Sequence, residues 1–282
     1  EMKMRYITEE MLEKFSASLV DEEKSPATVK KYVRDAEDFC MRMGRKGIDK
    51  YAVLEYKEYL IERYAPASVN SKLSSLNSFF EFNEWYELRV KTLKIQRRLF
   101  ADKELELTKS EYERLLTAAR ESGDERLFLL MQTICSCGLR VSEVRFVTLE
   151  AVKKRQAKIR CKGKIRQIFL PDGLCRMLLK YAKSCGVRSG AVFVTRGGKP
   201  LDRSNIWKML KGLCAEAGVQ RDKVFPHNLR HLFARTFYSA QKDIVRLADI
   251  LGHSSVNTTR IYTMETGEVH RRQIQNLGLL RF

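Results

Sequence analysis

The sequence has no long apolar run. No stretch approaches the roughly 18 residues that a membrane-spanning helix needs. The opening residues, Glu-Met-Lys-Met-Arg, contain no apolar segment suited to a secretory signal. Both absences argue against a membrane protein and against a secreted one, and we therefore expect the protein to be cytoplasmic.

Paired-cysteine motifs are also missing, and histidine is scarce. The seven cysteines are odd in number and include no Cys-x-x-Cys pair. We therefore expect no disulfide framework, no zinc module and a reducing compartment. Of the four histidines, His227 and His231 are spaced i, i+4, but no third metal ligand follows at a suitable spacing. We expect no metal or other cofactor, and we interpret His231 and His270 as packing or surface residues.

Acidic residues are few relative to basic ones. The formal net charge is +18. It is +2 over residues 1–100 (19 basic, 17 acidic) and +16 over residues 101–282 (34 basic, 18 acidic). Such an uneven distribution favours a polyanionic partner over a general solubility role.

The first 88 residues have the pattern of a small helical bundle. Apolar residues recur at helical spacing in four segments, which begin near Thr8, Pro26, Lys50 and Pro66. Thr8 suits an N-cap, and Pro26 suits the first position of a helix. The polar and basic stretch 89–104 is interpreted as an interdomain linker.

Residues 105–282 are predicted to mix helices with a β-hairpin. Thr108 and Glu111 have the spacing of a capping box. Apolar and polar residues alternate from 152 to 169, around a turn near Gly163, and eight basic residues lie between 152 and 166. The expected fold is mainly α with a small hairpin, in two domains.

Three motifs in this second region suit phosphate chemistry. Guanidinium groups donate paired hydrogen bonds to phosphate oxygens, and a phenol can act as a nucleophile. A helix is predicted from Asp243 to Leu251, closed by Gly252, and Asn257-Thr258-Thr259 is expected to cap a short helix that bears Tyr262. The motifs are Gly138-Leu139-Arg140-Val141-Ser142-Glu143, Pro226-His227-Asn228-Leu229-Arg230-His231, and Gly252-His253 followed by Thr258-Thr259-Arg260-Ile261-Tyr262.

The order and spacing of these motifs resemble the active site of tyrosine recombinases, the integrase and Xer-type enzymes that cut and rejoin DNA through a phosphotyrosine. The resemblance is sharpest from Thr108 to Thr263. It implies a helical core-binding (SAM-like) domain over residues 1–88 and a catalytic α+β domain over residues 105–282. It also implies site-specific recombination of double-stranded DNA through a Holliday junction, by a homo-tetramer that exchanges its apolar C-terminal tail.

The resemblance assigns roles to the motif residues. Tyr262 would be the nucleophile, and Arg140 and Arg230 would hold the phosphate oxygens. His227 would exchange a proton, and His253 would donate a hydrogen bond to the phosphate. All five residues have side chains that match the demands of metal-free phosphodiester cleavage.

The general acid for the leaving oxygen is expected on the hairpin. The family carries a lysine in a Gly-Lys-Gly type of turn, and Lys162, directly before Gly163, matches it. Cys161 replaces the usual first glycine, and Lys164 is the competing candidate. Glu143, three residues after the first arginine, would orient that arginine, and a surface salt bridge is the alternative.

Two other functions stay open, a type IB topoisomerase and a catalytically silent DNA-binding protein. The target site and the role (integration, excision, inversion, resolution or mobile-element transfer) do not follow from the sequence. Because the chain does not begin with methionine, a preceding arm-binding domain also stays open. Expected DNA contacts are Lys158, Arg160, Lys164, Arg97 and Arg98.

Overall fold

The computed structural model describes residues 4–43, 47–95, 105–161, 164–262, 271 and 274–277. The chain divides into two compact units, Glu1–Arg97 (unit 1) and Arg98–Phe282 (unit 2). The described parts are mainly helical and contain one two-stranded antiparallel sheet, which confirms the expected fold class. None of the described helices combines the length and apolar character needed to cross a membrane.

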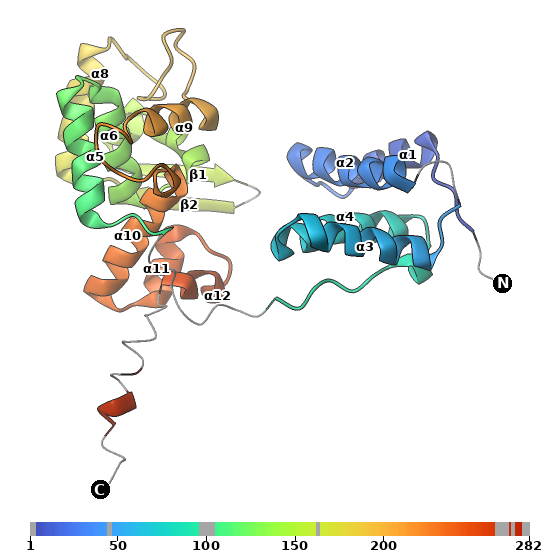
Figure 1. Cartoon of the computed structure of the whole chain (residues 1–282). Helices are drawn as coiled ribbons and strands as arrows, with labels where there is room; N and C mark the ends of the chain where they lie inside the picture. Colours follow the sequence, from blue (N-terminus) through green and yellow to red (C-terminus); the bar gives the residue numbers. More distant parts are fainter. Residues whose placement is uncertain are drawn as a thin grey trace, which may run out of the picture. The chain divides into compact units, whose positions relative to one another are not determined.

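Unit 1 is a bundle of four helices (Figure 1). Thr8 caps the first of them as predicted, because its side chain accepts a hydrogen bond from the Met11 N–H. Aromatic rings fill the core, where Phe79 makes edge contacts with Phe15 and Trp85. The elements are α1 (Glu9–Asp21), α2 (Pro26–Met43), α3 (Lys50–Arg63), α4 (Pro66–Phe82) and the 3-10 helix η1 (Tyr86–Leu88).

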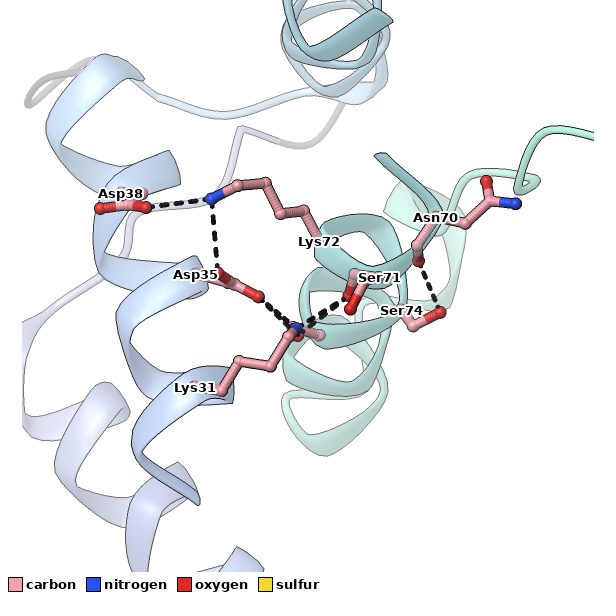
Figure 2. Close-up of polar contacts among 8 residues, drawn as sticks. Lys31, Asp35, Asp38, Asn70, Ser71, Lys72 and Ser74 are labelled. Carbon is pink, nitrogen blue, oxygen red and sulfur yellow. Dashed lines mark hydrogen bonds and ion pairs between the residues drawn. The ribbon is translucent and has the colours of Figure 1, made fainter. Parts of the chain in front are cut away.

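A buried carboxylate joins α2 to α4. Asp35, whose side chain is 2% exposed, accepts hydrogen bonds from Lys31 Nζ at 2.6 Å and from Ser75 Oγ at 2.8 Å. Lys72 Nζ lies 3.4 Å from the other carboxylate oxygen, and Figure 2 shows the two lysines reaching it from the two helices. Lys31 also donates to Ser71 O and Ser75 Oγ, so its three N–H donors all have partners inside unit 1.

This cluster, the Asp35 clamp, stays charged at neutral pH. Burial by itself raises the pKa of Asp35. Hydrogen bonds from Lys31 and Ser75, with the charges of Lys31 and Lys72, outweigh burial and hold the pKa below its ordinary value. The clamp is therefore an ion pair network that ties two helices together.

The chain leaves unit 1 along α4. Asn77 Nδ2 donates to Val90 O at 2.8 Å and Asn77 Oδ1 accepts from the Val90 N–H at 2.9 Å, and Asn70 holds Leu93 in the same way. Val90 is buried in the core of unit 1. The beginning of the predicted linker therefore packs on unit 1, and residues 96–104 lie outside the described residues.

The first α-helix of unit 2 begins with the predicted capping box. The Thr108 hydroxyl accepts from the Glu111 N–H at 3.1 Å, and the Glu111 carboxylate accepts from the Thr108 N–H at 2.8 Å. In Figure 1, α10, α11 and α12 lie together at one side of the unit. The elements are α5 (Lys109–Glu121), α6 (Glu125–Cys137), η3 (Val141–Phe146), α7 (Leu149–Lys153), β1 (Gln156–Cys161), β2 (Lys164–Phe169), α8 (Asp172–Ser184), α9 (Arg203–Gly212), η4 (Arg221–Lys223), α10 (Pro226–Gln241), α11 (Ile244–Leu251), α12 (Val256–Thr259) and η5 (Arg260–Tyr262).

The hairpin of β1 and β2 has the predicted alternation. Ile159 and Ile168 are buried, whereas Lys158 and Arg160 are exposed. The two strands pair antiparallel, with Cys161 opposite Lys164. One face of the hairpin therefore covers the core, and the other presents basic side chains.

The first strand begins later than predicted. It starts at Gln156, and Val152 belongs to the short helix α7. Thr148 caps that helix by accepting a hydrogen bond from the Ala151 N–H at 3.1 Å. This local cap outweighs the alternating pattern over these residues.

Candidate active site

Side chains from three separate segments of unit 2 meet at one place. Arg140 precedes η3, His227 and Arg230 lie in the first turns of α10, and His253 and Tyr262 follow α11. Arg230 Nη2 lies 3.2 Å from His253 Nε2, and the rings of His253 and Tyr262 are stacked with centroids 6.4 Å apart. The structure thus brings together five of the residues that the sequence motifs predict.

Arg230 is the most deeply buried of the five, at 1% exposed. Its guanidinium donates to Gly138 O at 2.5 Å and to Leu251 O at 2.7 Å. Both carbonyls end helices, where the helix dipole places negative partial charge. Burial, with the charges of Arg140 and Arg166, lowers the pKa of Arg230 to about 10, so it stays charged at neutral pH.

A buried glutamate holds the arginines. The Glu143 side chain is 2% exposed and accepts from Arg140 Nη1 at 2.9 Å and from the Arg140 N–H at 2.7 Å. Arg166 from β2 donates to the same carboxylate, and Arg230 Nη1 lies 3.9 Å from it. One carboxylate therefore faces three guanidinium groups, and the excess positive charge suits a phosphate.

Gly138 allows this arrangement at the end of α6. It has φ of 62°, in the left-handed region that favours glycine. A Cβ at this position would lie 2.5 Å from the Phe233 ring on α10. The close approach of α10 brings the Arg230 side chain to the Gly138 carbonyl.

His253 is held as a neutral imidazole. Its Nδ1 lies 2.8 Å from Oγ1 of the buried Thr259, and its Nε2 faces Arg230. Because a guanidinium only donates, Nε2 accepts, and the hydrogen-bond pattern assigns the proton to Nδ1. Burial, with the charges of Arg230 and Arg140, lowers its pKa to about 4. Donation from Nε2 to a phosphate oxygen would require a proton on that nitrogen and release of Arg230.

Tyr262 packs against histidine rings and is 6% exposed. The His231 ring meets it at 83°, with centroids 5.1 Å apart. Burial raises the pKa of the phenol, although the charges of Arg230 and Arg140 oppose that shift. The phenol is therefore protonated at neutral pH and lies beside cations that would stabilise its anion.

The segment that carries Tyr262 is built from local caps. Asp243 caps α11, and Gly252 closes it with φ of 63°, as predicted. The cap of α12 differs from the prediction. Ser255 precedes the helix and accepts from the Asn257 N–H at 3.2 Å, whereas residues 257–259 lie inside it. The hydroxyl before the helix is the one placed to reach its first free N–H groups.

Comparison with known proteins shows the family to which this chain belongs. The model of the phage integrase family matches residues 106–268, which is more than half of the chain. The chain belongs to the phage integrase family of tyrosine recombinases.

Several relatives resemble this recombinase over nearly its whole length. The tyrosine recombinase XerD of Xanthomonas campestris pv. campestris is 31% identical over 277 residues, which are 89% of this chain and 84% of that protein. XerA of Pyrococcus furiosus is 28% identical over 290 residues, 99% of this chain and 98% of that protein. These relatives favour recombination over the topoisomerase alternative.

Solved structures share the fold. A crystal structure of XerA recombinase has a TM-score of 0.53 at 26% identity, covering 98% of this chain and 100% of that one. A lambda integrase tetramer bound to a Holliday junction has a TM-score of 0.73 at 18% identity, covering 91% and 77%. At that identity the second likeness shows the fold alone.

The recombinase site also contains Arg166, which the sequence motifs do not predict. It lies on the inward face of β2 opposite Ile159, and it donates to Glu143 and to Ile250 O. Gly252 leaves room for it, since a Cβ there would lie 2.5 Å from Arg166 Cδ. The alternation along the hairpin is the signal that could have found it, because Arg166 occupies an inward position.

The other predicted residues lie apart from this cluster or outside the described chain. Lys158 and Arg160 are exposed on the outer face of β1. The backbone of Lys164 opens β2, but its side chain is outside the described part. Among the described residues, no group of three His, Cys, Asp or Glu side chains could hold a metal. The predicted residues outside the described ranges are Lys162, Arg97, Arg98 and His270.

Proposed function

We propose that this recombinase cleaves and rejoins DNA at specific sites through a 3′-phosphotyrosyl intermediate. The observation that carries the proposal is the buried Tyr262 phenol beside the charges of Arg230 and Arg140, which Glu143 holds. A nucleophile and two phosphate-binding forks in one place are what in-line attack on a phosphodiester requires.

In the cleavage step, the Tyr262 oxygen bonds to phosphorus and the bond from phosphorus to the 5′ oxygen breaks. Arg140 and Arg230 stabilise the charge on the non-bridging oxygens. His227 takes the phenol proton, and Lys162 gives a proton to the 5′ oxygen. The phosphotyrosine conserves the bond energy, so a 5′-hydroxyl can attack it and rejoin the strand without a nucleotide cofactor.

His227 suits the role of proton acceptor. Its side chain reaches the surface at the start of α10. Partial burial, with the charges of Arg230 and Arg140, lowers its pKa. The imidazole is therefore neutral at neutral pH, and it can accept a proton and pass it to solvent.

Recombination requires that the same chemistry occur on two duplexes. We propose that the functional unit is a homo-tetramer on two DNA sites, and that strands are exchanged through a Holliday junction. The tail, residues 266–282, would pass between subunits. Its described part supports this, because Ile274 and Leu277 are 69% and 62% exposed and offer apolar surface to a partner.

Of the two proposed domains, the core-binding domain (1–88) and the catalytic domain (105–282), charge supports DNA as the substrate mainly for the second. The net charge of +16 lies in residues 101–282, and Lys158 and Arg160 present exposed cations on the hairpin. Affinity should therefore fall steeply with salt. Arg97 and Arg98 in the linker and Lys164 in β2 are further proposed contacts.

The proposed location is the cytoplasm. Six cysteines in the described part of the chain carry free thiols. Free thiols, some of them partly exposed, suit a reducing compartment.

A nicked duplex tests the proposed function. DNA fragments that flank the native gene, each nicked beside a trial cleavage site, would be incubated with the recombinase and resolved in denaturing gels. We expect a covalent adduct with the native chain and none with Tyr262→Phe. Tyr238→Phe, a matched loss of a hydroxyl on α10, should keep the adduct. An adduct formed by Tyr262→Phe would show that another residue is the nucleophile.

A further inference from the structure

His231 lies between the proposed nucleophile and the proposed proton acceptor. Its ring meets the Tyr262 ring with centroids 5.1 Å apart at 83°, and it meets the His227 ring at 4.2 Å and 60°. The perpendicular arrangement with Tyr262 is a favoured geometry for two aromatic rings. The sequence suggests that His231 is a packing or surface residue. In the structure its ring packs on Tyr262, the proposed nucleophile.

Proton transfer is not a task that suits His231. Burial, with the charges of His227, Arg235 and Arg230, lowers its pKa to about 3. An imidazole of such low basicity is a poor acceptor for the proton of a phenol whose own pKa is raised. Its Nε2 atom is buried and has no hydrogen-bond partner among the described residues. The contacts of His231 with His227 and Tyr262 are therefore made by its ring and not by a hydrogen bond from Nε2.

Tyr262 needs tertiary contacts for its orientation. It ends η5, a 3-10 helix of three residues that follows α12 directly. So short a segment has few hydrogen bonds of its own and needs tertiary packing for its position. Within the described residues, the ring partners recorded for Tyr262 are His231 and His253. The first of these lies on α10, the same helix as Arg230.

We infer that His231 is a positioning residue that holds the Tyr262 ring in register with the phosphate-binding arginines. This inference rests on the proposed strand-transfer function. Three positions in the first two turns of one helix then serve the three participants in cleavage. His227 serves the proton, Arg230 the phosphate and His231 the nucleophile. Because α10 is a single helix over these residues, its register sets the distance from the phenol oxygen to the phosphorus.

The first test is the single-turnover rate of covalent adduct formation at saturating recombinase. His231→Ala should lower this rate by about 10- to 100-fold, the scale expected for a misplaced nucleophile, with DNA affinity unchanged within about 3-fold. His231→Phe keeps a ring and should recover most of the loss. His231→Leu fills the space without a ring and should recover little. A native rate in His231→Ala, or a His231→Phe as slow as His231→Ala, would overturn the inference.

The second test separates positioning from a structural role. In a Tyr262→Phe background, hydrogen peroxide can replace the phenol: its oxygen bonds to phosphorus, the bond to the 5′ oxygen breaks, and that oxygen takes up a proton. Adding His231→Ala should leave peroxide cleavage unchanged within about 2-fold, because mutations that act through a missing group lose their effect. A drop in peroxide cleavage equal to the drop in adduct rate would mean that His231 supports the phosphate pocket instead.

The matched control is Phe128→Ala, which removes a ring from α6. That ring packs on the main core of unit 2, with Arg120 4.6 Å from its centroid, so any loss should be equal with either nucleophile. The two hypotheses also fail separately. No adduct with the native chain would remove the proposed function, whereas a normal adduct that His231→Ala leaves unaffected would remove the positioning role alone.

Discussion

Each unit buries a carboxylate among cations, and the two clusters have opposite consequences. Around Asp35 the cations are lysines, and Lys31 uses all three of its donors inside unit 1. Around Glu143 the cations are arginines, and the Arg140 side chain is 39% exposed. The first cluster closes on itself, whereas the second leaves part of a guanidinium group exposed to solvent.

The difference follows from the chemistry of the two cations. An ammonium carries three donors at one point, and a few acceptors satisfy it. A guanidinium carries five donors in a planar fork, so that one edge can bind a carboxylate while another remains free. Net charge therefore does not by itself locate a phosphate site. The number of donors left over after internal pairing is the better guide.

The largest expected effect tests the fork directly. Arg140→Lys keeps the charge but loses the paired donors, so the rate of covalent adduct formation should fall by about 10²- to 10³-fold. Single-turnover cleavage of the nicked duplex measures it. Arg145→Lys changes an exposed arginine in the 3-10 helix that Arg140 precedes. It is the control and should stay within about 2-fold. A lysine that works as well as Arg140 would remove the distinction between the two clusters.

The next effect concerns the carboxylate of the open cluster. Glu143→Gln removes the negative charge that faces three arginines. We expect the adduct rate to fall by about 10- to 100-fold because the arginines lose their orientation. The exposed Glu216→Gln controls for a change in total charge. Unaltered cleavage in Glu143→Gln would mean that the backbone alone positions Arg140.

The closed cluster should affect stability rather than chemistry. Asp35→Asn should destabilise unit 1 by about 1.5–3 kcal/mol, since hydrogen bonds to a charged group are lost. Urea unfolding can be followed through Trp85 fluorescence in a Trp207→Phe background, because these are the two tryptophans of the sequence. The adduct rate of the folded variant should match the native rate. If cleavage falls while stability holds, Lys31 and Lys72 contact DNA after all.

The smallest expected effect is a difference between the two units in how their stability changes with pH. The pKa of His253 is lowered from 6.5 to about 4. As pH falls, His253 therefore takes up a proton in the unfolded chain at a higher pH than in the folded chain. Unit 2 loses stability as pH falls from about 6.5 toward 4. The pKa of Asp35 is held below 3.8, so the clamp contributes above that pH and is lost only below it. Urea midpoints reported by Trp207 and Trp85 at pH 7, 5 and 3.5 should diverge between pH 7 and 5, and parallel curves would contradict this.

Local signals predicted much of the fold. The Thr8 cap, the box of Thr108 and Glu111, and Gly252 after α11 each act within one helical turn, and the structure confirms them. Where two local signals compete, the sequence pattern did not rank them. Thr148 favoured a helix where alternation favoured a strand, and Ser255 took the capping position expected two residues later.

The site was predictable in part. The motifs pointed to Arg140, Arg230 and Tyr262, which the fold brings together. They did not point to Arg166 or to the contact of His231 with the nucleophile. The alternation along β2 places Arg166 on the inward face, but it does not identify Glu143, 23 positions away, as the partner.

The sequence by itself determined the residue types of the site, the helices that carry them and the sign of the charge that attracts a partner. Each of these depends on neighbours a few positions apart, because caps, periodicity and composition are short-range properties. Only the tertiary structure decided which cations keep donors free, which histidines are neutral and which ring faces the tyrosine. Those outcomes depend on burial and on partners from distant segments, since desolvation and hydrogen bonding are set by whatever the fold packs around a group.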